Sequence, residues 1–238
     1  MSLISQNLQA VHEAIALSAM RYDRNPTEIA LLAVSKTFGP EQVVDAWHAG
    51  QRAFGENYLQ EGVDKIAAVK CLLADQAASE QPVWHFIGPI QSNKTRPIAE
   101  HFSWVHSVDR EKIASRLSEQ RPHELGPLNI CLQVNISGEN SKSGVHPDEV
   151  LALAKQVVQL PNLRLRGLMS VPEASDDEVV QRQAFRRLAE LQQQLQLQGF
   201  VLDTLSMGMS ADMPAAIAEG STLVRIGSAI FGKRHYAV

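Results

Sequence analysis

The stretch "ALLAVSKTFGP", Ala30 to Pro40, decides the fold of this chain. Five apolar residues run into Ser35 and Lys36, and Gly39-Pro40 then stops the run. An unbroken apolar run of this length is typical of a parallel strand that is covered on both faces. The lysine at its end is therefore either a solvated surface group or a side chain at the mouth of a site.

The same pattern, an apolar run followed by an amphipathic helix, recurs along the rest of the chain after one N-terminal helix. The predicted strands are Ile29–Ser35, Arg52–Gly55, Trp84–Ile87, Trp104–Val108, Leu128–Ile136, Leu163–Met169, Thr204–Ser206 and Thr222–Ile226. The predicted helices between them are Glu41–Ala49, Leu59–Leu73, Asn93–His101, a helix that Asp109 caps and that ends near Glu119, Pro147–Gln159, Asp177–Gln198 and Met213–Ala218. Within the sixth unit, Asp176 and Asp177 mark the helix start and Gly199 its end.

Eight strand-then-helix units predict an α/β protein with a single (β/α)8 barrel of the TIM type over residues 1–238. The main alternative is a doubly wound open sheet. No strand is followed by the glycine-rich dinucleotide fingerprint that would support that alternative.

Composition narrows the classes of function. The 238 residues are 45% hydrophobic and carry a net charge of -4 with both signs interspersed, which argues against nucleic-acid binding through bulk charge. The two cysteines have no metal-ligand spacing and suit a reducing compartment. The N-terminus lacks the pattern of a signal peptide, and no apolar run is long enough for a membrane helix. We therefore expect a cytoplasmic protein that has no metal site and no membrane association.

In a (β/α)8 barrel, sites are built where the strands end at their carboxyl termini. The loops after strands seven and eight often bind a phosphate. Here one loop carries Gly208 and Ser210, and the other carries Gly227 and Ser228. Glycine lets the backbone approach a ligand closely, and the N–H groups at a helix start suit an anion. Either loop alone reads better as a tight turn, whereas the pair at this position favours phosphate binding.

A phosphate subsite gives Lys36 a chemical role. A partly desolvated lysine among the strand ends can form a Schiff base with a carbonyl compound. A phosphate-bearing aldehyde would use both features. Pyridoxal 5'-phosphate (PLP) and the sugar phosphate of an aldolase both fit this description, and the residues alone do not separate them.

Seven stretches resemble the YggS/PROSC family of PLP-binding proteins, in order and over almost the whole chain. They are "LLAVSKT", "FGENYLQE", "WHFIGPIQSNKTRPI", "VNISGENSKSG", "RLRGLMS", "LSMGMSADM" and "GSTLVRIGSAIFG". The string "WHFIGPIQSNK" is the most specific, because no general rule of the fold requires it. The resemblance implies a barrel similar to the N-terminal domain of alanine racemase and a role in PLP homeostasis without an established turnover reaction.

The resemblance also implies roles for particular residues. Lys36 matches the lysine that holds PLP as an internal aldimine, and Arg225 matches the arginine that faces the pyridine nitrogen. Main-chain and hydroxyl donors of the phosphate loop correspond to Gly227 and Ser228, and Ser206 corresponds to a second phosphate contact. The residues expected to line the ring are Asn57 and Met169.

Three functions follow as hypotheses. The first is a PLP carrier or buffer that passes PLP to PLP-dependent apo-enzymes. The second is an amino-acid racemase or related PLP enzyme, for which Tyr58 is the candidate second base. The third is a Schiff-base aldolase. The positive charge of Arg225 beside the ring nitrogen disfavours protonation of the ring, which weakens PLP as an electron sink and favours the carrier.

Three further expectations remain. The loop Ser137–Pro147 contains Lys142, which reads better as a solvated lysine than as a second acceptor of PLP. His85 is expected to be a buried histidine with a hydrogen-bond partner. Because no counterpart of the second domain of alanine racemase was found, we expect a monomer.

Overall fold

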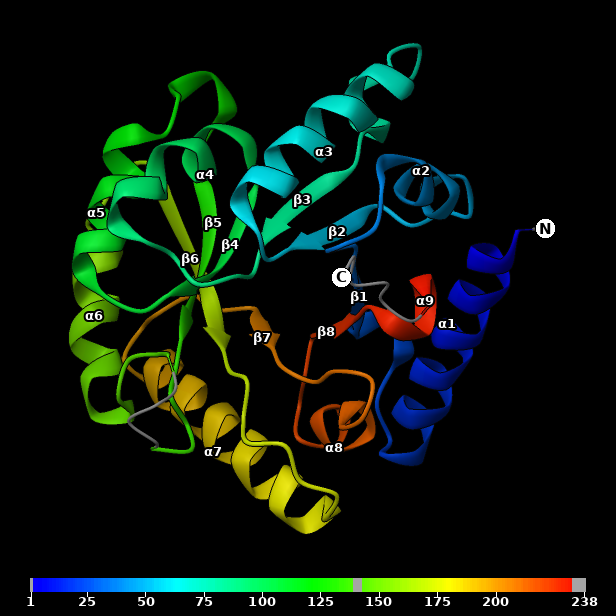
Figure 1. Cartoon of the computed structure of the whole chain (residues 1–238). Helices are drawn as coiled ribbons and strands as arrows, with labels where there is room; N and C mark the ends of the chain where they lie inside the picture. Colours follow the sequence, from blue (N-terminus) through cyan, green and yellow to red (C-terminus); the bar gives the residue numbers. More distant parts are fainter. Residues whose placement is uncertain (1, 139–142, 233–238) are drawn as a thin grey trace, which may run out of the picture.

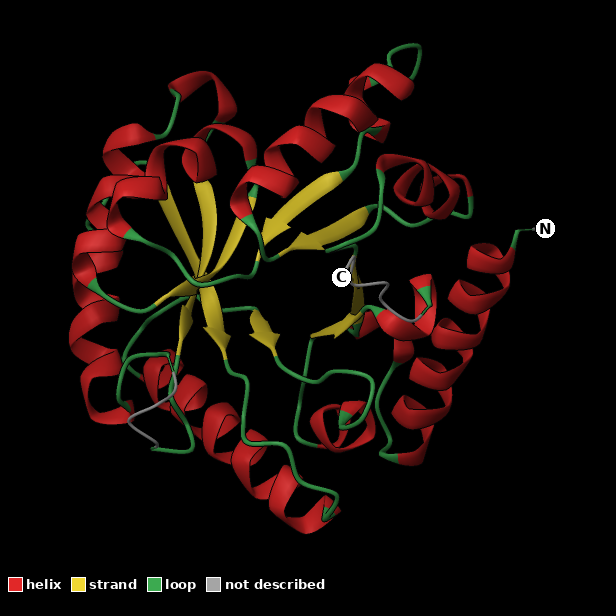
Figure 2. Ribbon diagram, viewed as in Figure 1, coloured by secondary structure: helices red, strands yellow, loops and turns green. Residues whose placement is uncertain are grey.

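The computed structural model describes residues 2–138 and 143–232, and within them eight parallel strands close into one barrel (Figures 1 and 2). The strands pair in the order of the sequence, and β1 pairs with β8 to close the ring. They are β1 (Ala30–Val34), β2 (Ala53–Glu56), β3 (Val83–Phe86), β4 (Trp104–Val108), β5 (Leu128–Gln133), β6 (Leu163–Met169), β7 (Thr204–Ser206) and β8 (Leu223–Ile226). The predicted (β/α)8 barrel is therefore confirmed.

Helices surround the strands, and each lies between two consecutive strands of the barrel (Figure 2). These are α2 (Pro40–His48), α3 (Leu59–Leu72), α4 (Thr95–His101), α5 (Glu111–Gln120), α6 (Val150–Val157), α7 (Glu178–Leu197) and α8 (Met213–Ala218). Two more helices are α1 (Leu3–Arg21), which precedes the barrel, and the short α9 (Ser228–Phe231), which follows β8. Large apolar side chains such as Phe54, Phe86 and Phe185 are fully buried.

The N-terminal helix α1 packs along α2, α8 and α9 (Figure 1). Its buried face contains Leu8, Val11 and Ile15, as its 3.6-residue periodicity predicts. In the loop that follows α1, Arg24 donates hydrogen bonds to the carbonyl oxygens of Ile217 and Ser221 at 3.0 and 2.6 Å. The helix therefore braces the part of the barrel where the first and last strands meet.

Several element boundaries differ from the predictions. The fifth strand ends at Gln133 rather than Ile136. Beyond it, Val134 forms an isolated bridge to Val145 and donates a backbone hydrogen bond to the carbonyl oxygen of Met169 at 2.8 Å. The fourth helix begins at Thr95, after a separate 3-10 turn over Ser92–Lys94.

The start of α5 was also predicted one residue too early. Its N-cap is Arg110, which has extended backbone, so the helix begins at Glu111. Asp109 does not cap the helix and pairs instead with Arg110 at 2.6 Å. By contrast, Asp177 caps α7 as predicted, because its side chain accepts a hydrogen bond from the backbone N–H of Val179 at 2.8 Å.

None of the helices in the described part of the chain combines the length and apolar composition that crossing a membrane requires.

Candidate functional site

The carboxyl ends of the strands surround a cavity of about 390 Å³. Six of the seven predicted site residues line this cavity, and Ser206 does not. The six are Lys36, Asn57, Met169, Arg225, Gly227 and Ser228. Ser210 from the loop after β7 also lines it, as do the apolar residues Val34, Ile87, Val171, Met209 and Ala211. Both loops that the sequence marked as a phosphate subsite therefore reach the same cavity.

Two cationic side chains reach the cavity from adjacent strands. In the pairing of β1 with β8, Leu32 lies beside Arg225 and Ala33 beside Ile226. Lys36 follows β1 by two residues and is half-buried, whereas Arg225 is a residue of β8 and is 5% exposed. Closure of the barrel thus brings together a lysine and an arginine that are far apart in the sequence.

Arg225 is held by three hydrogen bonds on one side of its guanidinium group. Its Nη1 donates to the carbonyl oxygen of Ser206 at 2.6 Å and to the Ser206 hydroxyl at 2.8 Å, and its Nη2 donates to the carbonyl oxygen of Ser170 at 2.9 Å. Burial lowers the pKa of Arg225 to about 10, so the guanidinium is still charged at neutral pH. Its Nε–H has no hydrogen-bond partner among the described residues.

Below the cavity, a chain of buried polar groups crosses the barrel interior. The hydroxyl of Ser206 lies 2.8 Å from His106 Nδ1, and His106 Nε2 lies 2.9 Å from His85 Nδ1. His85 stacks on Trp104 with ring centroids 5.2 Å apart. Ser206 therefore lies beneath the cavity and supports Arg225, and His85 is a buried histidine with a partner, as expected.

His85 and His106 are both neutral at pH 7. Burial lowers the pKa of His85 to about 3. Burial, together with the nearby His85 and the positive charge of Arg225, also lowers the pKa of His106 well below its ordinary value. A charged imidazole here would lose its hydration without gaining an anionic partner.

The structure explains one residue of the string "WHFIGPIQSNK", because Gly88 lies where no side chain would fit. A Cβ atom on Gly88 would lie 1.9 Å from the carbonyl oxygen of Asn57, so a side chain there would displace the main chain of a cavity residue. The carbonyl oxygen of Gly88 also accepts a hydrogen bond from the Ser107 hydroxyl at 2.5 Å. The close approach of two backbones positions Asn57.

We expect Gly88→Ala to lower the free energy of unfolding by about 2 kcal/mol, because the new methyl group overpacks rigid backbone. Urea denaturation followed by circular dichroism measures this change. Gly199→Ala is the matched control, because its Cβ meets open space and its cost comes from a φ of +92° alone. A Gly88 variant no less stable than the Gly199 variant would contradict the expectation.

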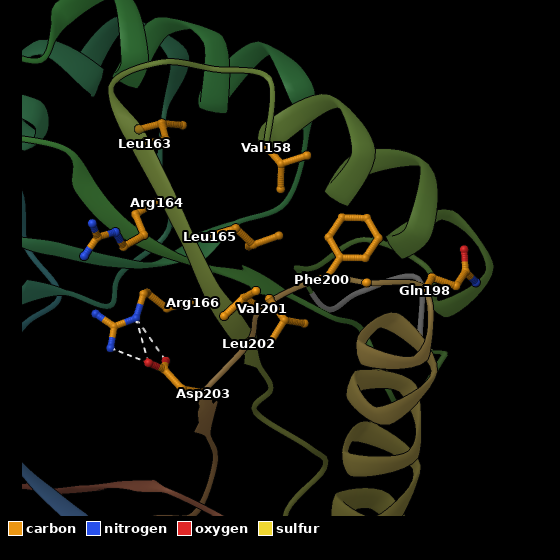
Figure 3. A pocket seen from close by; sticks show the side chains of 11 residues that line it. Val158, Leu163, Arg164, Leu165, Arg166, Gln198, Phe200, Val201, Leu202 and Asp203 are labelled. Atoms are coloured by element: carbon orange, nitrogen blue, oxygen red, sulfur yellow. Dashed lines mark hydrogen bonds and ion pairs between the residues drawn. The ribbon is translucent and has the colours of Figure 1, made fainter.

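A larger cavity of about 640 Å³ lies elsewhere, beside the first half of β6 and the segment that leads into β7 (Figure 3). Apolar side chains including Val158, Leu165 and Phe200 form one part of it. Arg166 and Asp203 form an ion pair at 2.6 Å on its other side (Figure 3). None of the predicted site residues lines this cavity, so we place the functional site at the carboxyl ends of the strands.

Two other sequence candidates, Tyr58 and Lys142, lie away from the cavity and outside the described residues, respectively. Tyr58 is 53% exposed and is not a lining residue. Glu56, which ends β2, is fully buried and bonded to Ser35 and Lys65. Lys142 lies outside the described residues. The apolar lining residues carried no chemical signal in the sequence, although Ile87 directly follows β3.

Comparison with known proteins defines the class first. The family described as "Alanine racemase, N-terminal domain" matches residues 7–235. A solved alanine racemase from Clostridium difficile has a similar fold, with a TM-score of 0.66 and 12% identity over 89% of this chain and 56% of that chain. The fold and the family match together confirm the expected similarity to the N-terminal barrel of alanine racemase.

Closer relatives define the family within that class. Proteins named "Pyridoxal phosphate homeostasis protein" are 58% identical in Pseudomonas aeruginosa, over 99% of this chain and 98% of the relative, and 52% identical in Escherichia coli K12, over 100% and 99%. PipY of Synechococcus elongatus, solved with PLP bound, has a TM-score of 0.81 and 34% identity over 96% of this chain and all of that chain. This chain belongs to the pyridoxal phosphate homeostasis protein family.

Proposed function

We propose that this chain binds PLP in the cavity at the strand ends and serves PLP homeostasis as a carrier or buffer. The observation that carries the proposal is that Lys36 and Arg225 line one cavity together with the hydroxyls of Ser210 and Ser228. In this assignment Lys36 Nζ bonds to the aldehyde carbon of PLP with release of one water molecule. PLP binding by the PipY relative and the names of the curated relatives support it.

The donor groups of the cavity fit PLP. The Nε–H of Arg225, which lacks a partner among the described residues, suits an acceptor such as the pyridine nitrogen. The side-chain oxygen of Asn57 is buried and also lacks a partner in the described part of the chain. A volume of about 390 Å³ lies in the range of small-molecule sites. We assign Arg225 to the ring nitrogen, and Asn57 and Met169 to the walls around the ring.

The phosphate is assigned to the loops after β7 and β8. Ser210, Gly227 and Ser228 line the cavity and offer hydroxyl and backbone donors. The sequence resemblance had assigned a second phosphate contact to Ser206. The position of Ser210 supports a phosphate contact better, because the hydroxyl of Ser206 is already bonded to Arg225 and His106.

The site favours holding PLP over catalysis with it. PLP, when bound, supplies an electron sink for a carbanion. The charge of Arg225 opposes protonation of the ring, so the side chain that fixes the cofactor also weakens the sink. Among the described lining residues, the ionisable side chains are Lys36 and Arg225, which leaves a racemase without a second base in this part of the chain. The racemase-like enzyme is the alternative, and deuterium exchange at Cα of added amino acids tests it.

We further propose that residues 1–238 form one PLP-binding domain, that the protein is a cytoplasmic monomer, and that PLP-dependent apo-enzymes are the recipients of its PLP. Transfer of PLP to an apo-enzyme faster than its dissociation into solution would support the carrier role. Elution of the purified protein as a dimer in size-exclusion chromatography would contradict the monomer.

The absorbance spectrum of the purified protein, before and after borohydride reduction, tests the PLP assignment. We expect a visible band that borohydride abolishes, and peptide mass mapping should find the pyridoxyl group on Lys36. Lys94→Ala, on the 3-10 turn before α4, serves as the control variant and should keep the band. A protein that gains no band when PLP is added would rule out the assignment and return Lys36 to the aldolase hypothesis.

A further inference from the structure

The residue after Lys36 has an unusual backbone conformation. Thr37 has a φ of +69°, in the left-handed region that β-branched residues disfavour strongly. Apart from Asp23, it is the one non-glycine residue with positive φ in residues 2–138 and 143–232. Strained backbone of this kind persists only where surrounding contacts hold it, and it gathers at functional sites.

Helix α3 supplies one of those contacts. The backbone N–H of Thr37 donates a hydrogen bond to Glu61 Oε1 at 2.5 Å. The same oxygen accepts a hydrogen bond from Lys65 Nζ at 2.9 Å, one helical turn further along α3. A carboxylate that accepts from both groups fixes the strained residue to a rigid helix.

Lys65 also holds the residue before Lys36. Its Nζ donates to the carbonyl oxygen of Ser35 at 2.7 Å and to Glu56 Oε1 at 2.7 Å. The hydroxyl of Ser35 donates to that same Glu56 oxygen at 2.6 Å. Lys65 therefore uses all three of its N–H donors, two of them on groups that fix Ser35 directly or through Glu56.

In the cluster of Glu56, Glu61 and Lys65, the first and last residues are buried and Glu61 is partly buried, and none of the three lines the cavity. The side chains of Lys65 and Glu56 are 3% and 0% exposed, and that of Glu61 is 32% exposed. An isolated lysine would not be buried to this degree, because its desolvation needs the compensation that the two carboxylates provide. The contacts of the cluster are made to residues 35 and 37, on either side of Lys36.

We propose that Lys65 and Glu61 are positioning residues that hold residues 35–37 in the conformation that presents Lys36 to the cavity. They determine whether Lys36 Nζ can reach the aldehyde carbon of PLP. They do not affect the contacts that the cavity makes with the ring and the phosphate. This inference rests on the proposed PLP function. It predicts that covalent capture depends on the cluster, whereas non-covalent binding of the same ring and phosphate does not.

Two ligands separate these effects: PLP, and 4-deoxypyridoxine 5'-phosphate, which has the same ring and phosphate but no aldehyde. We expect Lys65→Met and Glu61→Ala each to weaken PLP binding by about tenfold or more, the effect of losing a charge-assisted hydrogen bond. Binding of the deoxy compound should change by less than about threefold, within the variation of a remote substitution. Equilibrium titration followed by absorbance and intrinsic fluorescence gives both affinities.

Matched variants complete the design. Lys70→Met changes an exposed lysine on the same helix and should alter neither affinity. Glu61→Gln keeps an oxygen that accepts from the Thr37 N–H and should restore PLP affinity relative to Glu61→Ala. Circular dichroism establishes that each variant is folded. If Lys65→Met does not fold, the comparison of Glu61→Ala with Glu61→Gln decides the matter.

Equal weakening of both ligands in a folded variant would show a merely structural role and overturn the proposal. Unchanged binding of both ligands would overturn it as well. Failure of the unsubstituted protein to bind either ligand would instead overturn the proposed PLP function, so the two failures are distinguishable.

Discussion

Acid should destabilise this protein through its two buried histidines. The pKa of His85 is about 3 in the folded protein, below the ordinary value of 6.5. Between these two pH values the unfolded chain therefore binds a proton at His85 that the folded protein does not bind. Stability is therefore full above pH 6.5 and is lost as the pH falls toward 3. At pH 4.5 the loss from His85 is roughly 2.5 kcal/mol. His106, whose pKa is also lowered, adds to the loss in the same direction.

Urea denaturation between pH 7 and 4.5 measures this effect. Between pH 7 and 4.5, the double variant His85→Gln, His106→Gln should lose at least roughly 2.5 kcal/mol less free energy of unfolding than the wild-type protein. The slopes of the free energy of unfolding against pH must be compared between variant and wild type, because other groups titrate in the same range. Burial raises the pKa of Glu56, for example, which acts in the opposite direction. His48→Gln, on the exposed surface, should keep the wild-type slope. A double variant with an unchanged slope would contradict the expectation.

Arg225→Met should remove about 3 kcal/mol of stability at pH 7. The substitution leaves two carbonyl oxygens and the Ser206 hydroxyl without their donor inside the barrel, and each such loss costs about 1–3 kcal/mol. Relief from burying the guanidinium group offsets part of that cost. PLP binding should weaken at least about tenfold, because the ring nitrogen loses its donor.

Two variants serve as controls for Arg225. Arg164→Met replaces an exposed arginine at the start of β6 and should change stability by less than about 0.5 kcal/mol. Arg225→Lys keeps the charge but lacks the planar fork that reaches both Ser206 and Ser170, so it should recover only part of the loss. Full recovery with lysine would show that charge alone matters there and would refute the geometric explanation.

The sequence predicts the barrel well because its strands are buried on both faces. Each strand therefore appears as a short apolar run, and the helices between them have a different periodicity. The end of the fifth strand was missed because "VNI" continues the apolar pattern while pairing stops at Gln133. The start of α5 was missed because an aspartate is a common N-cap, whereas here Asp109 pairs with Arg110.

The candidate site is predicted less completely. The rule that barrel sites lie at strand ends brought Lys36 and the two phosphate loops to one place, and the family resemblance added Arg225. It does not say whether a strand-end hydroxyl points into the cavity or beneath it, and Ser206 and Ser210 differ in this respect. Nothing in the local sequence shows that Lys65 reaches back to Ser35 across 30 residues, because such contacts depend on how α3 packs on the barrel.

The pairing of β1 with β8 has a consequence for the making of this protein. Ala30 lies beside Leu223, so the ring closes through a contact between the first and last strands to be synthesised. A nascent chain on the ribosome has Lys36 long before it has Arg225, and seven strands leave an open edge with unpaired N–H and C=O groups. The cavity is complete only when the eighth strand has joined the barrel. A partly synthesised chain therefore cannot capture the cofactor in this site. Ligand capture is thereby reserved for chains that have completed the ring.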